Sequence, residues 1–425
     1  MQPPTGLLGV LVILAIGFAL CRHRAHIRVR TVAVGVALQF ALAFLLLRFP
    51  PVVAAFDLFA AGVTRVIGFA DRGTEFVFGK AADASAPWGF IFAVKVLPII
   101  VFFASFMAVL YHLGVMQRVV AGLAWVIRRT LGISGAEALS AAANIFLGQT
   151  EAPLTVKPFI AGMTRSQVMC IMVGGFATIA GSVMAAYITM VGGEDPAMRL
   201  EVAKHFMTAS VMSAPAGIVM AKLMLPETEP VAHESLDALR GMPRTTVNVM
   251  DAAAEGATDG LRLALNVAAM LVAFVSLLAM LNWPLAAISE WPAVAEWRAA
   301  RALPVFTFQN LLGWIFTPLA WCLGVGADAQ KVGSLMGQQI ICTEFVAYAD
   351  LAKSVREGTI SARGQNIATY ALCGFANLPS IAIQIGGLSA MAPSRRGDFA
   401  QLGLRAMIAG ALACWMTGAV ASLFI

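Results

Sequence analysis

A short polar sequence occurs twice in this chain, each time inside a long apolar stretch, and it restricts the possible folds more than any other feature. The first copy reads Gly148-Gln149-Thr150-Glu151-Ala152-Pro153 and the second reads Cys342-Thr343-Glu344-Phe345. A Gly-Phe-Ala triplet follows each copy, at 175–177 and at 374–376, so the two halves stay nearly in register. The chain is therefore expected to contain a long internal repeat with one polar interruption in each half.

The composition places both interruptions in a membrane. Of the 425 residues, 60% are hydrophobic and only 12% are charged, and the mean hydropathy is +0.82. These values exclude an ordinary soluble domain. The six cysteines lie in apolar stretches without metal-site spacing. The net charge of +6 comes from Lys and Arg in short connecting segments, which indicates orientation in a membrane rather than binding to nucleic acid.

The fold class expected is an all-α polytopic membrane protein with about eight transmembrane helices. The spans are expected at about 7–20, 32–47, 88–113, 167–191, 206–225, 261–281 and 367–388, with the last ending at residue 425. The first span lacks a cationic region and a cleavage site, so we expect a retained helix rather than a signal peptide. Arginines in 22–30 place that loop in the cytoplasm, which puts the N-terminus outside the inner membrane.

Other segments are expected at the membrane surfaces. Residues 50–87 mix charges with apolar runs, as an amphipathic helix on the outer surface would. Residues 117–129 carry arginines among apolar residues, which favours a helix at the cytoplasmic interface, and 306–323 mirror that helix in the second half. Trp283, Trp291 and Trp297 indicate an outer interfacial segment.

Two segments are too short to cross twice and are expected to form re-entrant hairpins, each of two half-helices. They are 134–165 and 330–354, and counting crossings places their entrances on opposite sides, so the repeats are inverted. The expected divisions are scaffold helices (1–113), the first repeat (114–225), a cytoplasmic loop (226–259), a scaffold helix with the outer segment (260–303) and the second repeat (304–425). Inverted repeats with broken helices are typical of secondary transporters working by alternating access.

The two glutamates are the first candidates for function, because a carboxylate at the bilayer centre costs at least about 2.5 kcal/mol. Glu151, with Gln149 and Thr150, offers donors and acceptors to a polar heterocycle, while Glu344 suits vicinal hydroxyls. Asn377 and Ser380 would assist Glu344. A purely structural role, in which each glutamate braces its own hairpin, stays open.

These motifs resemble those of the concentrative nucleoside transporter family. The resemblance rests on Gly148 to Leu154, Glu344-Phe345-Val346-Ala347-Tyr348 and Gly374-Phe375-Ala376-Asn377, and it extends from about Trp88 to the C-terminus. It implies a homotrimer that moves nucleosides inward with sodium or protons. It also assigns the substrate residues: Gln149, Thr150, Glu151 and Val183 toward the nucleobase, and Glu344, Asn377 and Ser380 toward the ribose, with Phe375 nearby.

The same resemblance implies a sodium site between the first hairpin and the following helix. Asn144 and Thr178 would supply side-chain oxygens, and Leu147 and Ile179 backbone carbonyls. Alternatively, Asn144 only satisfies backbone groups in a broken helix. Composition does not separate sodium from proton coupling, and no other cofactor is expected.

The chain also departs from the family's motifs. Gln339 stands where a lysine is usual, Thr343 where an asparagine is usual, and Pro379 removes a backbone donor next to Asn377. These changes leave open a different nucleoside-like or hydroxylated solute. An intramembrane hydrolase with Glu151 and Glu344 as acid and base is the other alternative, although a nucleophile elbow and a metal triad are lacking.

Overall fold

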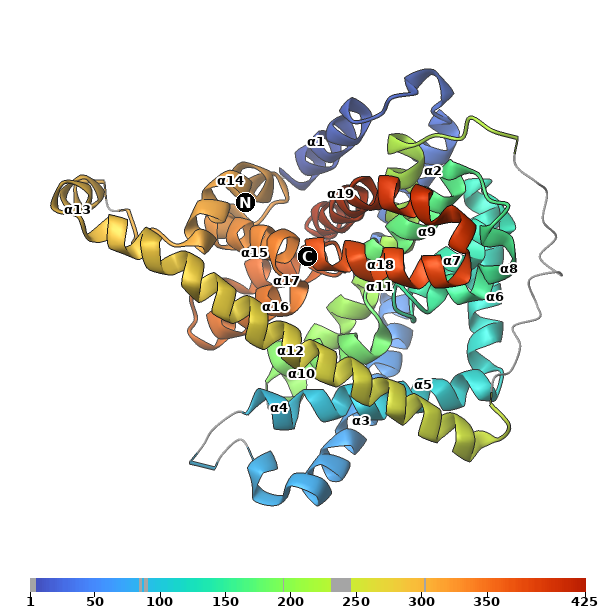
Figure 1. Ribbon diagram of the computed structural model, residues 1–425, viewed down its shortest axis with the longest axis horizontal. Coiled ribbons are helices and arrows are strands. Elements are labelled where there is room, and N and C mark those ends of the chain that lie inside the picture. The colour runs from blue at the N-terminus through green and yellow to red at the C-terminus, as the bar shows by residue number, and fades with distance from the viewer. Residues whose placement is uncertain (1–4, 84–85, 88–90, 194, 231–245, 302) are drawn as a thin grey trace.

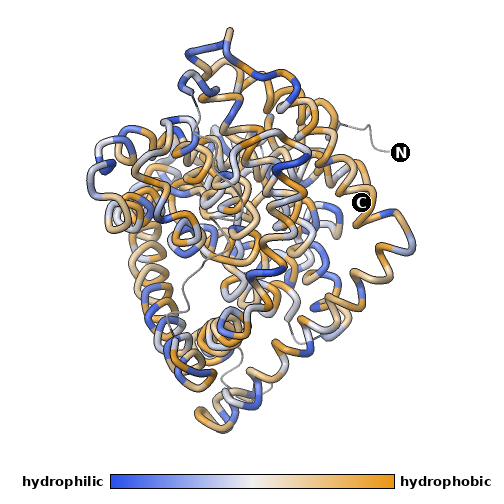
Figure 2. The backbone as a smooth tube through the Cα atoms, turned by 90° about the vertical axis from the view of Figure 1, so that its right-hand side faces the viewer, coloured by the Kyte–Doolittle hydropathy of each residue, from blue (hydrophilic) through white to orange (hydrophobic). Residues whose placement is uncertain are grey.

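The computed structural model describes residues 5–83, 86–87, 91–193, 195–230, 246–301 and 303–425, and this part of the chain is helical without strands. Among the described residues, seven helices are long and apolar enough to cross a membrane, and two shorter apolar helices accompany them. Figure 2 shows apolar residues along the peripheral helices as well as at the centre. The expected all-helical polytopic class is confirmed.

The α-helices of the described residues follow one another in this order: α1 (Thr5–Ala19), α2 (Val29–Leu47), α3 (Pro50–Phe78), α4 (Phe92–Lys95), α5 (Leu97–His112), α6 (Val115–Leu131), α7 (Gly135–Asn144), α8 (Lys157–Ile160), α9 (Arg165–Ala177), α10 (Gly181–Gly192), α11 (Pro196–Met224), α12 (Val249–Glu290), α13 (Pro292–Ala299), α14 (Phe308–Cys322), α15 (Ala329–Ile341), α16 (Glu344–Arg356), α17 (Ala362–Ala371), α18 (Leu378–Met391) and α19 (Arg396–Ala421).

The core consists of the helices from the two repeats. The span 165–192 is 94% buried, whereas the span of α12 is only 17% buried, so the peripheral helices present apolar side chains outward. The order interfacial helix, hairpin, broken helix and long helix occurs at α6 to α11 and again at α14 to α19. The internal repeat expected from the polar sequences is therefore present as a repeat of elements.

The N-terminal part differs in one respect from the sequence prediction. Residues 50–78 form the single helix α3, which with the following turn is long and apolar enough to cross a membrane, whereas a surface helix was expected. Its buried residues, Ala60, Ile67, Ala70 and Thr74, have the helical spacing of one face, so the amphipathic pattern itself is present. Trp88, the expected start of the third span, lies outside the described residues.

The helix α12 is 42 residues long and crosses the whole view of Figure 1 beside α5. The expected span at 261–281 is too short at both ends, because Pro284 is accommodated inside the helix and the helix already begins at Val249. Part of the loop expected at 226–259, residues 231–245, lies outside the described residues. Glycines permit the close packing on α5: a Cβ at Gly256 would lie 2.8 Å from the carbonyl oxygen of Ala104.

The first hairpin has one regular limb. The helix α7 begins with a capping box in which Ser134 and Glu137 exchange hydrogen bonds, and it ends at Asn144. The return limb is a 3-10 turn (Ala152–Val156) followed directly by the four-residue helix α8, so it is shorter and less regular than α7. Pro158 contributes to this, because it lacks the N–H that a continuous helix through 152–160 would need. The second hairpin has two limbs, α15 and α16, as expected.

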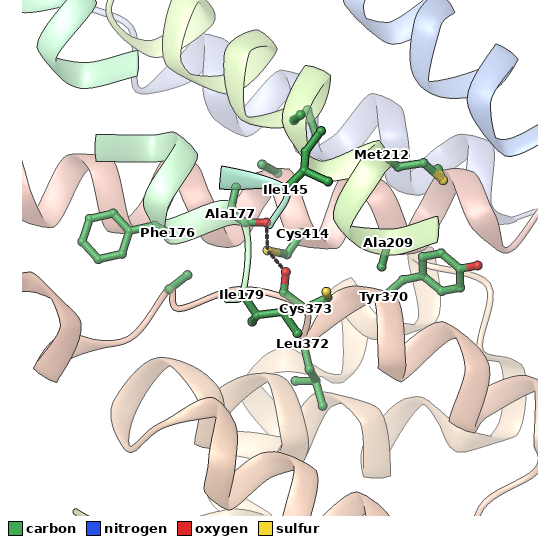
Figure 3. Close-up of a cluster of buried hydrophobic side chains, with 14 of the residues drawn as sticks. Ile145, Phe176, Ala177, Ile179, Ala209, Met212, Tyr370, Leu372, Cys373 and Cys414 are labelled. Carbon is green, nitrogen blue, oxygen red and sulfur yellow. Dashed lines mark hydrogen bonds between the residues drawn. The ribbon is translucent and has the colours of Figure 1, made fainter. Parts of the chain in front are cut away.

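Both broken helices meet at their interruptions. The chain unwinds at 178–180 between α9 and α10, and at 372–377 between α17 and α18, inside the expected spans 167–191 and 367–388. The N–H of Phe375 donates to the carbonyl oxygen of Thr178 at 3.3 Å, and the thiol of Cys414 contacts carbonyl oxygens of Ala177 and Cys373 at 3.5 Å (Figure 3). Backbone groups freed by each break are thus satisfied inside the protein, as an apolar environment requires.

Candidate functional site

A cavity of about 300 Å³ lies where the two hairpin turns, the broken helices and α12 converge. All eight residues that the sequence analysis assigns to the substrate line it: Gln149, Thr150, Glu151, Val183, Glu344, Phe375, Asn377 and Ser380. These residues come from both halves of the chain, so the cavity exists only because the repeats pack against each other. We call it the central cavity.

Glu344 is held at one side of the central cavity by two donors. It is the first residue of α16, where the helix N-terminus favours a negative charge. The Asn377 amide donates to Oε2 at 2.6 Å, and the Tyr187 hydroxyl donates to Oε1 at 3.0 Å. Two acceptor positions per carboxylate oxygen leave capacity for further donors. The side chain is only 3% exposed, so it is desolvated and oriented before any ligand arrives.

Tyr187 is a residue that sequence reasoning missed. It lies on α10, is fully buried, and packs its ring against Phe345 and Tyr348 with centroids 4.6 and 4.4 Å apart. The tyrosine therefore connects the first repeat to the second hairpin. The sequence does contain one sign of this role: Tyr187 lies alone inside the expected fourth span, and a buried tyrosine hydroxyl usually has a hydrogen-bond partner.

The helix α18 orients the remaining polar groups on this side. Asn377 is its N-cap residue, and its Oδ1 accepts from the N–H of Ser380 at 2.8 Å while its amide reaches Glu344. The Ser380 hydroxyl accepts from the Gln149 amide at 3.2 Å. This last bond joins the first polar sequence to α18.

The first hairpin supplies the opposite side. Oε2 of Glu151 accepts from the N–H of Gly148 at 2.9 Å, which fixes the turn, while the side chain stays exposed to the cavity. Oε1 of Gln149 is buried and has no hydrogen-bond partner among the described residues. A buried acceptor without a donor is unfavourable, so a ligand donor would stabilise this position.

The helix α12 forms a third side that the sequence analysis did not include. Leu263, Val267, Met270 and Leu271 give it an apolar surface, and Asn266 adds one amide. Asn266 was visible as a polar residue within an expected span, but nothing in the sequence showed which way it faces.

The three departures from the family's motifs have distinct places. Gln339 does not line the central cavity; its amide donates to the carbonyl oxygens of Leu372 and Gly374 at 3.1 and 2.9 Å, inside the break of α17 and α18. Thr343 does line the cavity, and its hydroxyl caps α16 by accepting from Val346 at 3.4 Å. Pro379 occupies the first turn of α18, where a missing N–H is tolerated.

The four candidate sodium ligands lie at two chain interruptions, Asn144 and Leu147 at the end of α7 and Thr178 and Ile179 between α9 and α10. The N–H of Gly181 donates to the carbonyl oxygen of Phe146 at 2.9 Å and joins these two segments. Asn144 is fully buried; its amide donates to the carbonyl oxygen of Ser140 at 3.0 Å, and its Oδ1 has no partner among the described residues. The hydroxyl of Thr178 donates to Gly174 at 2.9 Å and retains its acceptor capacity. Among the described residues none donates to the carbonyl oxygens of Leu147 and Ile179. Neutral oxygens of this kind suit a hard monovalent cation.

Three family models match the chain in succession. The descriptions are Na+ dependent nucleoside transporter N-terminus for residues 8–81, Nucleoside recognition for 93–194, and Na+ dependent nucleoside transporter C-terminus for 205–422. Together they cover most of both repeats.

Relatives and solved structures agree with these matches. An uncharacterized transporter of Haemophilus influenzae is 45% identical, with 100% of this chain and 98% of that protein covered. Sodium/nucleoside cotransporter 1 of Mus musculus is 37% identical over 98% of this chain and 63% of its own length. The structure of CNTnw in an inward-facing substrate-bound state has a TM-score of 0.88 and 41% identity, with 99% of this chain and 97% of that chain covered. A CNTnw variant in an outward-facing state gives a TM-score of 0.90 at 40% identity, with the same coverage, 99% and 97%.

Proposed function

The chain belongs to the Na+-dependent nucleoside transporter family, and from this premise we propose that it imports nucleosides across the inner membrane together with sodium, by alternating access. The members of the family are transporters and not enzymes, so Glu151 and Glu344 are not the acid and base of a hydrolase.

The observation that carries the proposal is the pairing of two different polar surfaces across one cavity. The Glu344 carboxylate, oriented by the Asn377 amide that donates to it, is an acceptor that suits the paired hydroxyls of a ribose. Gln149 and Glu151 offer an amide and a carboxylate to the edge of a nucleobase, with Val183 as an apolar contact. The Gln149 amide donates to the Ser380 hydroxyl across the cavity, and a nucleoside would replace this bond with two bonds of its own.

The sodium proposal rests on the position of Asn144 relative to the substrate residues. Asn144 ends α7 and Leu147 lies in the turn, a few residues before Gln149 and Glu151. An ion that orders these oxygens would also fix the turn in its binding conformation. Such shared ordering makes the binding of ion and nucleoside mutually favourable.

The surrounding architecture is proposed to follow the divisions expected from the sequence. We assign 1–113 and 249–303 to a scaffold, 114–225 and 304–425 to two inverted repeats, and 226–248 to a cytoplasmic loop; residues 249–259, which the sequence analysis placed in the loop, belong to α12. The N-terminus lies outside, and three copies associate. Exposed apolar residues on α12, among them Leu261, Leu265 and Val272, provide a surface for the copies or for lipid.

A competition panel in proteoliposomes tests the substrate class. Uptake of labelled uridine should be inhibited by nucleosides, weakly by 2′,3′-dideoxynucleosides, and not by free nucleobases or nucleotides, because Glu344 needs the hydroxyls and the carboxylates of Glu151 and Glu344 repel phosphates. Equal inhibition by free nucleobases would show that the transporter does not recognise the ribose.

A different hydroxylated solute is the second candidate, because Thr343 and Gln339 depart from the family's motif. Thr343→Asn should keep uridine and adenosine as substrates and change their affinity by about one hydrogen bond, on the order of 1 kcal/mol. Asparagine also caps helices well, so α16 should be preserved. Negligible wild-type uptake that Thr343→Asn with Gln339→Lys restores would instead favour the second candidate.

A further inference from the structure

Two basic segments far apart in sequence meet away from the central cavity. Arg28 and Arg30 lie at the start of α2, and Arg128 and Arg129 in the last turn of α6. The buried hydroxyl of Thr31 donates to the carbonyl oxygen of Leu131 at 3.3 Å, which holds the two helix ends together.

The space between these helix ends is a cavity of about 770 Å³, lined by residues 28–31 and by residues 125 and 128–132. All four arginines line it, and no aspartate or glutamate does. None of the four forms an ion pair with any described residue. Four uncompensated guanidinium groups around one cavity repel one another, so an anion would stabilise this arrangement. We call it the arginine cavity.

Carboxylates do lie nearby, in a smaller adjoining cavity that shares Arg28 and Arg128, but they have other partners. Glu137 is 2.5 Å from the ammonium of Lys222 and accepts from Ser134. Glu227 accepts from the Thr164 hydroxyl at 2.8 Å, and Glu229 accepts from the N–H of Arg165 at 3.5 Å. These carboxylates are therefore paired with Lys222 or with hydrogen-bond donors at helix starts, and not with the arginines.

The remaining lining indicates what kind of anion fits. Trp125 is 58% exposed at the edge of the arginine cavity, and Val126 and Val119 are exposed on the same helix. An indole beside exposed aliphatic residues is typical of the membrane–water interface. By the orientation proposed above, this interface faces the cytoplasm, where basic pockets between helices bind anionic lipid headgroups.

We propose that the arginine cavity binds the phosphate diester headgroup of an anionic phospholipid, with the guanidinium groups on the phosphate oxygens and the acyl chains along α6 beside Trp125. Four arginines suit a headgroup with two phosphates, so cardiolipin should bind more tightly than phosphatidylglycerol. This lipid site is separate from the nucleoside site.

Lipid titration of the purified full-length protein, followed by native mass spectrometry, tests the proposal. Arg30→Gln with Arg129→Gln changes two exposed arginines that line only the arginine cavity, and it should weaken cardiolipin binding about thirtyfold. Arg22→Gln with Arg24→Gln is the matched control: it removes the same charge from the segment just before α2, outside the cavity, and binding should stay at the wild-type level. The melting temperature in phosphatidylcholine, equal in all three proteins, shows that each variant folds.

Three results would overturn the proposal. Equal weakening by the control pair would mean that only overall charge matters. Unchanged binding in Arg30→Gln with Arg129→Gln would mean that the cavity is not the site. Glycerol phosphate competing at concentrations similar to those of the lipid would mean that the cavity takes a soluble anion instead.

Discussion

Glu344 shows how one side chain depends on both repeats. Its carboxylate accepts from Tyr187 on α10 and from Asn377 at the start of α18, so its position is set by the packing of three helices. A group oriented in this way loses little freedom when a ligand binds, which favours affinity.

We expect Glu344→Gln to weaken uridine binding by roughly 10- to 150-fold, because a hydrogen bond involving a charge contributes about 1.5–3 kcal/mol. The shape of the side chain is preserved, so the protein should still assemble. Isothermal titration with uridine and 2′,3′-dideoxyuridine measures the effect, and the variant should lose the preference for uridine. Glu357→Gln, the same change at an exposed site just after α16, is the control. Unchanged uridine affinity in Glu344→Gln would remove this residue from the site.

The prediction for the coupling ion concerns Asn144. Asn144→Ala removes the unpartnered Oδ1, and the dependence of uptake on external sodium should become flatter at fixed pH and membrane potential. Uridine binding at saturating sodium should fall less. Thr369→Ala is the control, because its buried hydroxyl bonds only to its own helix at Gln365. A sodium dependence that stays at the wild-type level in Asn144→Ala would contradict the proposed ion site.

The family resemblance assigned eight substrate candidates from the sequence. All eight line one cavity, to which both halves of the chain contribute. Tyr187 and Asn266 were not predicted, since their roles depend on which face of a buried helix meets another helix. A helix that is apolar all round gives no such direction.

The two helix breaks are the elements that bring the polar turns together. Gly374 lies at the crossing, where a Cβ would be 2.5 Å from the carbonyl oxygen of Phe176 and from the Cys414 sulfur. Only a residue without a side chain permits this approach. The break is thus fixed sterically as well as by the bond between Phe375 and Thr178.

Gly374→Ala should therefore destabilise the protein by about 1–3 kcal/mol, the usual cost of overpacking. Gly386→Ala is the matched control, because Gly386 lies inside α18 with open space around its Cα, and alanine there favours the helix. Melting temperatures of the purified proteins measure the difference. An equal melting temperature for Gly374→Ala and Gly386→Ala would contradict the close crossing.

Element boundaries were less predictable than the elements themselves. Broken helices were expected in both repeats, and the breaks lie near residues 178 and 374. The length of α12 was not expected, because tryptophans and a proline such as Pro284 usually mark the end of a membrane span. Gly256 and Gly260 let α12 pack on α5, and this packing stabilises the helix beyond its apolar centre. A contact between two distant segments of this kind cannot be predicted from the local sequence.

The whole molecule consists of a buried core that contains the broken helices and of apolar helices exposed at its periphery. The central cavity lies between these parts, since α12 lines one side and both hairpins line the others. Movement of the core along α12 would change which side of the membrane the cavity faces. The apolar side of α12 that faces the cavity, with Leu263 and Val267, presents few polar groups to hinder such movement.

Uptake driven by a sodium gradient is the most direct test of sodium-coupled nucleoside import. In proteoliposomes with an inward sodium gradient and fixed pH and membrane potential, labelled uridine should accumulate, chemically unchanged, above its external concentration. Replacing external sodium with choline should abolish the accumulation. Uptake that ignores sodium and follows a proton gradient, or no uptake of uridine and adenosine at all, would contradict the account.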